Sequence, residues 1–200
     1  MSKADTAISQ VVLAPITPIA LLLAGWWGSL LALGDSPAVG WFAAGGLAIG
    51  VALDATVLRR RLDSLFSMSD RALLLVALFY SIGVYGFFMG FPVFNAAIGI
   101  AGGYVVARRA VLTGRERERA LRDGRRVATT MTCVLGALCV ATAVMALNER
   151  TMGAQLQGML GLSFTVTWPM IYAIIGVGGT GLLAMQYAGT ILTARRFAPR

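Results

Sequence analysis

Long apolar stretches separated by short polar connections run along the whole of this chain. Most of them approach the roughly 20 residues that an α-helix needs to cross the hydrocarbon layer of a membrane. Because lipid offers the backbone no hydrogen-bond partner, such stretches form helices whose backbone groups are satisfied internally. The pattern predicts six membrane-spanning helices, at about residues 9–33, 38–58, 72–90, 93–107, 127–147 and 168–194.

These spans predict an all-α integral membrane protein. Taken in chain order, the six transmembrane helices pair as three hairpins, and residues 1–200 form a single polytopic membrane domain. Pro15 and Pro18 each remove a backbone donor, so we expect the first half of the first span to be kinked. Residues 34–37 and 89–92 combine glycine and proline and predict tight turns.

The charge distribution supports a membrane location and fixes an orientation. The chain is 58% hydrophobic and only 13% charged, whereas a soluble domain carries about 25% charged residues. Of its 17 Lys and Arg residues, all but Arg150 fall in every second connection. Positive charge is retained on the cytoplasmic side during insertion, so both termini are expected there (N-in/C-in). We expect the bacterial inner (cytoplasmic) membrane as the location.

The connection at residues 148–167 is expected on the outer side. Its apolar residues recur at roughly helical spacing, which predicts an interfacial or re-entrant helix rather than a solvated loop. These residues are Met152, Leu156, Met159, Leu160 and Phe164.

Aromatic residues gather toward the outer ends of the predicted spans. They are Trp26, Trp27, Trp41 and Trp168, together with Phe87, Phe88, Phe91 and Phe94. An aromatic belt at the membrane interface accounts for them. A ligand pocket that opens outward is the alternative interpretation.

The candidate functional residues of the membrane interior are Asp54, Asn95 and Gln186, which lie within the predicted spans. Asp54 is the only acidic one, and it either pairs with Arg59 near the inner interface or couples protons or cations to transport. Each amide is expected to find a partner in the bundle, as a contact between helices or as a contact to a substrate.

Glycine motifs in the spans favour close helix packing. Residues 176–181 match G-x-G-x-x-G, but a dinucleotide site needs a preceding strand, which a membrane span excludes. The pairs Gly46/Gly50 and Gly99/Gly103 lie in the second and fourth spans. Small residues let backbones approach closely in lipid, so we expect these two helices to cross there.

A basic cytoplasmic loop is expected at residues 108–126. Glu118–Arg122 and Arg119–Asp123 are i, i+4 pairs, so the segment should extend the fifth span into the cytosol as a helix. The segment either sets the topology alone or also docks anionic lipid or another membrane protein subunit. Its arginines are Arg108, Arg109, Arg115, Arg117, Arg119, Arg122, Arg125 and Arg126.

The residue inventory offers little chemistry for catalysis. The chain has no histidine, and Cys133 and Cys139 lie six residues apart in one apolar span. The usual acid–base and metal groups are therefore missing, and we expect no catalytic residues, no metal, no cofactor and no nucleic acid partner. Transport or permeation of a small solute, alone or as the membrane subunit of a transporter, is the favoured function. A non-enzymatic accessory or regulatory protein that docks partners through its arginine-rich loop is the alternative, and a membrane enzyme is the weakest.

Overall fold

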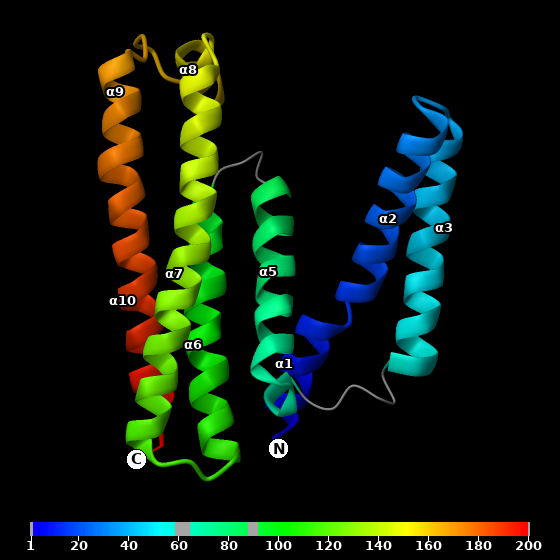
Figure 1. Cartoon of the computed structure of the whole chain (residues 1–200), viewed down its shortest axis with the longest axis vertical. Helices are drawn as coiled ribbons and strands as arrows, with labels where there is room; N and C mark the ends of the chain where they lie inside the picture. Colours follow the sequence, from blue (N-terminus) through cyan, green and yellow to red (C-terminus); the bar gives the residue numbers. More distant parts are fainter. Residues whose placement is uncertain (1, 59–64, 88–91, 200) are drawn as a thin grey trace. The chain divides into compact units, whose positions relative to one another are not determined.

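The computed structural model describes residues 2–58, 65–87 and 92–199, and all regular structure in these ranges is helical (Figure 1). The elements labelled η1 and η4 are π-helical and η2 and η3 are 3₁₀-helical. The order is α1 (Lys3–Leu13), α2 (Ile16–Leu33), α3 (Ala38–Leu53), η1 (Asp54–Leu58), η2 (Leu65–Ser67), α5 (Asp70–Phe87), η3 (Pro92–Phe94), α6 (Asn95–Leu112), α7 (Arg117–Asn148), α8 (Met152–Leu160), α9 (Trp168–Ala173), η4 (Ile174–Gly178) and α10 (Gly179–Phe197). The chain forms two compact units, Met1–Val76 and Ala77–Arg200.

Five helical segments of the described chain are long and apolar enough to cross a membrane. They are Lys3–Leu33, Ala38–Thr56, Asp70–Phe87, Arg117–Asn148 and Trp168–Phe197. The all-α class is therefore confirmed, and the chain has the helices of a membrane protein. The predicted span at 93–107 corresponds to α6, which is not in this set. Its 18 residues include Asn95, Arg108 and Arg109, so the count of six spans is not confirmed.

In the N-terminal unit, α2 and α3 form an antiparallel hairpin (Figure 1). Gly34 has a left-handed φ of 63° and begins the turn, and the Ser36 hydroxyl accepts a bond from the Ala38 N–H at 3.3 Å. Gly46 lies directly against the backbone of Leu21. A side chain at this position would force the two helices apart, so glycine permits the close approach.

The break predicted by the first two prolines separates α1 from α2. Helix α1 ends at Leu13 and Pro15 occupies the N-cap of α2, which confirms the interruption. The Ser9 hydroxyl on α1 accepts a bond from the Leu65 N–H at 3.2 Å and donates to the Asp5 carbonyl at 2.9 Å. A polar contact therefore holds η2 against α1.

In the C-terminal unit, α6, α7 and α10 lie side by side, with α7 antiparallel to the other two (Figure 1). Small residues line their contacts. On α6, Gly103 meets the backbone of Thr190. On α7, a β-carbon at Gly124 would lie 2.8 Å from the β-carbon of Ala194, and one at Gly136 would lie 3.9 Å from Leu183 Cδ2. These contacts fix the register of α10 against both neighbours.

The connection at residues 148–167 folds as predicted in part. Helix α8 occupies its centre, which confirms a helix there. Leu156 of α8 is buried against Val166 and Ile171, with Met152 packed beside them. The side chains of Met159 and Leu160 lie outside the described residues. The short helix thus caps the end of α9 with an apolar contact.

The glycine-rich motif lies entirely in helix. Gly176 and Gly178 belong to η4, and Gly179 and Gly181 begin α10. A dinucleotide fingerprint requires a strand before its glycines, so the helical prediction for residues 176–181 is confirmed.

Candidate functional site

The C-terminal unit buries several polar side chains between its helices. Ser81, Asn95, Gln186 and Thr190 are at most 2% exposed. Burying a polar group is unfavourable unless it is hydrogen-bonded. The hydrogen bonds of these four side chains therefore decide whether they are structural or available to a ligand.

Asn95 is half satisfied. Its Nδ2 donates to the Ser81 carbonyl on α5 at 2.7 Å, which confirms the predicted contact between helices. Its Oδ1 is buried and has no hydrogen-bond partner among the described residues. One atom of the amide therefore joins α6 to α5, while the other keeps an unused acceptor.

Gln186 departs from the prediction that each amide finds a partner in the bundle. Its side chain is 0% exposed, and within the described part of the chain neither Oε1 nor Nε2 has a hydrogen-bond partner. The side chain instead lies against Gly99, where an added β-carbon would come within 2.5 Å of Nε2. Thr190 Oγ1 donates at 2.7 Å to the backbone carbonyl of Gln186 and not to its amide. The described residues thus supply no hydrogen-bond partner to this fully buried amide.

Thr132 on α7 is a further candidate that the hydrophobic pattern did not reveal. Its Oγ1 is buried and, like the Gln186 amide, has no partner among the described residues. Thr142 on the same helix differs from Thr132, because its Oγ1 donates at 3.0 Å to the Leu138 carbonyl, one helical turn earlier. The signal available in the sequence is the spacing of four that links Thr132 to Gly124, Ala128 and Gly136.

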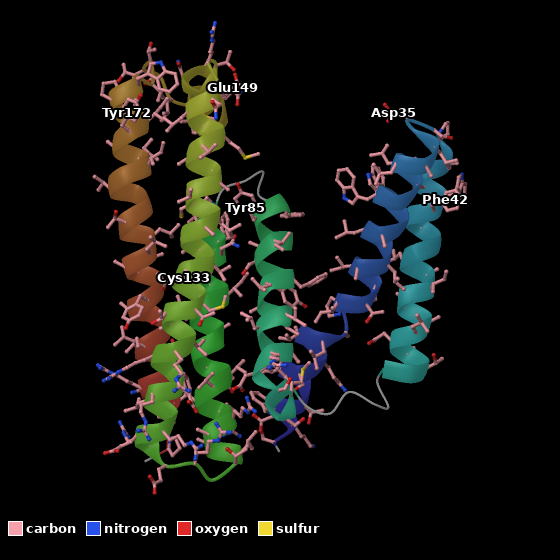
Figure 2. The ribbon with its side chains drawn as sticks, in the orientation of Figure 1. Asp35, Phe42, Tyr85, Cys133, Glu149 and Tyr172 are labelled. Carbon is pink, nitrogen blue, oxygen red and sulfur yellow. The ribbon has the colours of Figure 1, made fainter. Side chains whose placement is uncertain are left out.

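Three residues of α6, α7 and α10 each have a buried side-chain atom without a partner among the described residues, and we define them as the buried polar layer: Asn95, Thr132 and Gln186. An unsatisfied buried polar group costs about 1–3 kcal/mol. The layer presents acceptors on all three residues and donors on Thr132 and Gln186. Such a set can bind a guest that donates and accepts hydrogen bonds. Figure 2 labels Cys133, the neighbour of Thr132, and so marks this level on α7.

Asp54 lies elsewhere, in the N-terminal unit. It is the first residue of the π segment η1 and is partly buried. Its predicted partner Arg59 lies outside the described residues, so the ion pair stays a prediction.

The basic segment at residues 108–126 is mostly helical, which confirms the predicted helical extension of the fifth span and shortens the expected loop to a brief connection. Helix α6 continues to Leu112 and α7 starts at Arg117, so only residues 113–116 connect them. Asp123 forms its ion pair with Arg115 at 3.1 Å rather than with the expected Arg119. Arg117 Nη1 donates to the Pro199 carbonyl at 3.3 Å. The backbone reverses its direction at Gly114, which has a φ of 63°. This turn brings Arg115 within reach of Asp123 on α7.

Arginines gather at the end of the bundle where α6 meets α7 (Figure 2). Arg115 is partly buried in its ion pair, and Arg108 and Arg109 are partly buried on α6. The exposed members on α7 are Arg117, Arg119, Arg122, Arg125 and Arg126, and Arg195 and Arg196 are exposed on α10.

The four tryptophans all carry substantial exposed surface, from 41% at Trp168 to 80% at Trp41. Exposure of this extent is compatible with the interfacial belt, and the outward-opening pocket stays the alternative. Phe88 and Phe91, and most of the predicted turn at 89–92, lie outside the described residues. Tyr85 of α5 contacts Thr142 of α7, with 3.1 Å between the hydroxyl oxygens (Figure 2 labels Tyr85).

Comparison of the chain with known protein families, with curated proteins and with solved structures finds no match. The features that indicate a function are therefore the buried polar layer and the arginines at the end of the bundle.

Proposed function

We propose that this chain transports a small solute across a membrane or lets it permeate, alone or as the membrane subunit of a larger transporter. The observation that carries the proposal is the Gln186 amide, which is fully buried without a partner among the described residues. Polar residues inside membrane spans often mark the path or the binding site of a substrate.

The contrast with Asn95 supports a functional role for Gln186. A glutamine that served only to join helices would be expected to bond a neighbouring helix, as Asn95 does with the Ser81 carbonyl. Leucine has a similar volume and would fill the same position without an unsatisfied group. Keeping an unpaired amide there is therefore costly for the fold, and binding a solute would offset that cost.

Helix irregularities in the candidate spans are consistent with transport. The first membrane-length segment is broken between Leu13 and Ile16, the π segment η1 ends the second, and the π segment η4 interrupts the last. Transporters commonly place their sites at interrupted helices, where backbone groups are freed from the regular pattern.

We also propose a membrane topology of six spans. Helix α6 packs along α7 and α10, and both of those belong to segments of membrane length. It would therefore share their depth and complete six spans. The distribution of the arginines favours an orientation in which the α6–α7 connection and both termini lie on the cytoplasmic side, and we propose the bacterial inner membrane as the location.

Reconstitution into proteoliposomes tests the function. Water, glycerol and urea entry would be followed by stopped-flow light scattering, and proton and Na⁺ entry by trapped dyes. We expect at least one probe to enter faster than into protein-free liposomes, and Gln186→Leu to slow it. Leu192→Met is the matched control on α10, since Leu192 is 62% exposed. If every probe enters at the protein-free rate, the proposal is wrong.

Docking through the arginine end is the second candidate function. It is favoured by the exposed arginines Arg119, Arg122, Arg125 and Arg126, which precede the apolar part of α7. Each arginine near an anionic surface contributes about 1 kcal/mol to attraction. Replacing these four by glutamine should weaken binding of anionic lipid or of an acidic membrane partner, whereas Arg150→Gln at the other end of α7 should not.

A further inference from the structure

We infer that Thr132 and Gln186 together form a binding site for an uncharged molecule of about the size of water or ammonia, which both donates and accepts hydrogen bonds. The inference rests on the transport function proposed above and names its solute class. Thr132 belongs to this site because of its position on α7 and because its hydroxyl has no partner among the described residues.

The register of α7 against α10 puts the two residues at one depth. A β-carbon added to Gly136 would lie 3.9 Å from Leu183 Cδ2, and one added to Gly124 would lie 2.8 Å from the β-carbon of Ala194, so Gly136 and Gly124 of α7 lie opposite Leu183 and Ala194 of α10. From Gly136 to Thr132 is four residues, or about 6 Å along the axis. From Leu183 to Gln186 is three residues, or about 4.5 Å. The two positions therefore differ by only about 1.5 Å in depth.

Thr132 also lies on the face of α7 that contacts α10. Gly124 and Gly136 are eight residues before and four residues after Thr132, and both contact α10. Residues four apart stack on one face of a helix. Since Thr132 Oγ1 is buried and has no partner among the described residues, the hydroxyl is free to bond a guest beside Gln186.

The chemistry of the site selects an uncharged guest. The Gln186 amide supplies two donors and one acceptor oxygen, and the Thr132 hydroxyl supplies one donor and one acceptor oxygen. Thr132, Gln186 and the adjacent Gly99 carry no charge. An ion would need a charged partner to offset its desolvation inside the bundle. A neutral molecule needs only the hydrogen bonds that the two side chains offer.

The close packing of Gln186 against α6 admits only a small guest at this level. Gly99 lies so close to Gln186 that even a β-carbon there would sit 2.5 Å from Nε2 and 2.7 Å from Cδ. A water molecule needs two to four polar partners and little volume. Asn95 Oδ1, which is unpaired among the described residues, lies one helical turn before Gly99 and offers the next acceptor, about 6 Å along α6.

Proteoliposomes distinguish this solute class from others. Water entry would be measured under a sucrose gradient and ammonia entry from the rise in internal pH. We expect Thr132→Val and Gln186→Leu each to lower the protein-dependent rate about tenfold, because each removes hydrogen bonds of about 1–1.5 kcal/mol. Thr132→Ser should keep the rate. Thr130→Val is the matched control, since Thr130 is an exposed threonine of the same helix.

The outcomes separate the inference from the proposed function. Flux confined to Na⁺, protons or glycerol, or water flux unaffected by Thr132→Val, overturns the inference and leaves transport standing. No flux of any probe overturns both. The melting temperature in detergent is the second readout. An unchanged or raised value for Gln186→Leu supports an amide without a protein partner, and a fall of several degrees overturns the site.

Discussion

Gly99 and Gln186 face each other across the contact of α6 with α10, so closely that a methyl group on Gly99 would lie 2.5 Å from the amide nitrogen. One turn further along, the nearest atom to an added β-carbon on Gly103 would be the backbone carbonyl oxygen of Thr190, and the Thr190 Cγ2 would lie 3.2 Å away. Two glycines of one motif therefore have different neighbours. The first borders the buried polar layer, and the second sets how closely the helices approach.

Alanine substitutions should separate these two roles. Gly103→Ala pushes against a backbone carbonyl that cannot move alone, so we expect a loss of about 1–3 kcal/mol in stability. Gly99→Ala pushes against the end of a flexible side chain, so the loss should be smaller while solute flux falls. Gly181→Ala has open space around it and should be neutral or stabilising by up to about 1 kcal/mol. Thermal unfolding in detergent provides the measurement, and equal losses at all three glycines would contradict the packing.

The bond between Asn95 and Ser81 gives a second prediction. Asn95→Leu should lower stability by about 0.6–2 kcal/mol, because it removes a hydrogen bond between helices inside the bundle. Ser81→Ala should have little effect, since the acceptor is the backbone carbonyl of Ser81 and not its hydroxyl. Comparing melting temperatures of the two variants checks this. A larger loss for Ser81→Ala than for Asn95→Leu would show that the bond is assigned wrongly.

Glu149, just beyond α7, gives a prediction about pH. The Thr151 hydroxyl and backbone N–H donate to its carboxylate at 2.6 Å and 3.1 Å, and these bonds lower the pKa of Glu149. A lowered pKa means that the carboxylate stabilises this turn above its ordinary pKa of about 4.3. That contribution is lost as the pH falls through the folded-state value. Thr151→Val should raise the pKa of Glu149 toward the ordinary value in an NMR titration, whereas Thr113→Val should leave it unchanged.

Much of the helical layout could be predicted from the order of polar and apolar residues. Prolines and glycines interrupt the backbone pattern locally, so the break before Ile16 and the turn at Gly34 follow from neighbouring residues. The number of spans could not be predicted from neighbouring residues alone. Helix α6 contains Asn95 and two arginines, and its burial depends on α7 and α10 rather than on its own hydropathy.

The partners of individual side chains could not be read from the sequence. A glycine pair marks a face for close packing but does not say which helix will occupy it. Gly46 packs against Leu21 of α2, and Gly99 packs against Gln186 of α10, so the predicted partnership of the second and fourth spans is replaced by two others. Thr132 was missed because a threonine in an apolar span resembles any other small residue. Its importance arises from α10, more than fifty residues away.

The hydration of the Gln186 side chain tests the central claim most directly. The chain has four glutamines, Gln10, Gln155, Gln157 and Gln186, so glutamine labelled with ¹⁵N in its side chain gives few signals, and Gln186→Leu identifies the one of interest. Water-edited solid-state NMR in liposomes would then measure the transfer of magnetisation from water to Nε2. A binding site for a small hydrogen-bonding molecule predicts rapid transfer to Gln186 despite its complete burial. A Gln186 signal that receives magnetisation far more slowly than the exposed Gln155 would contradict it.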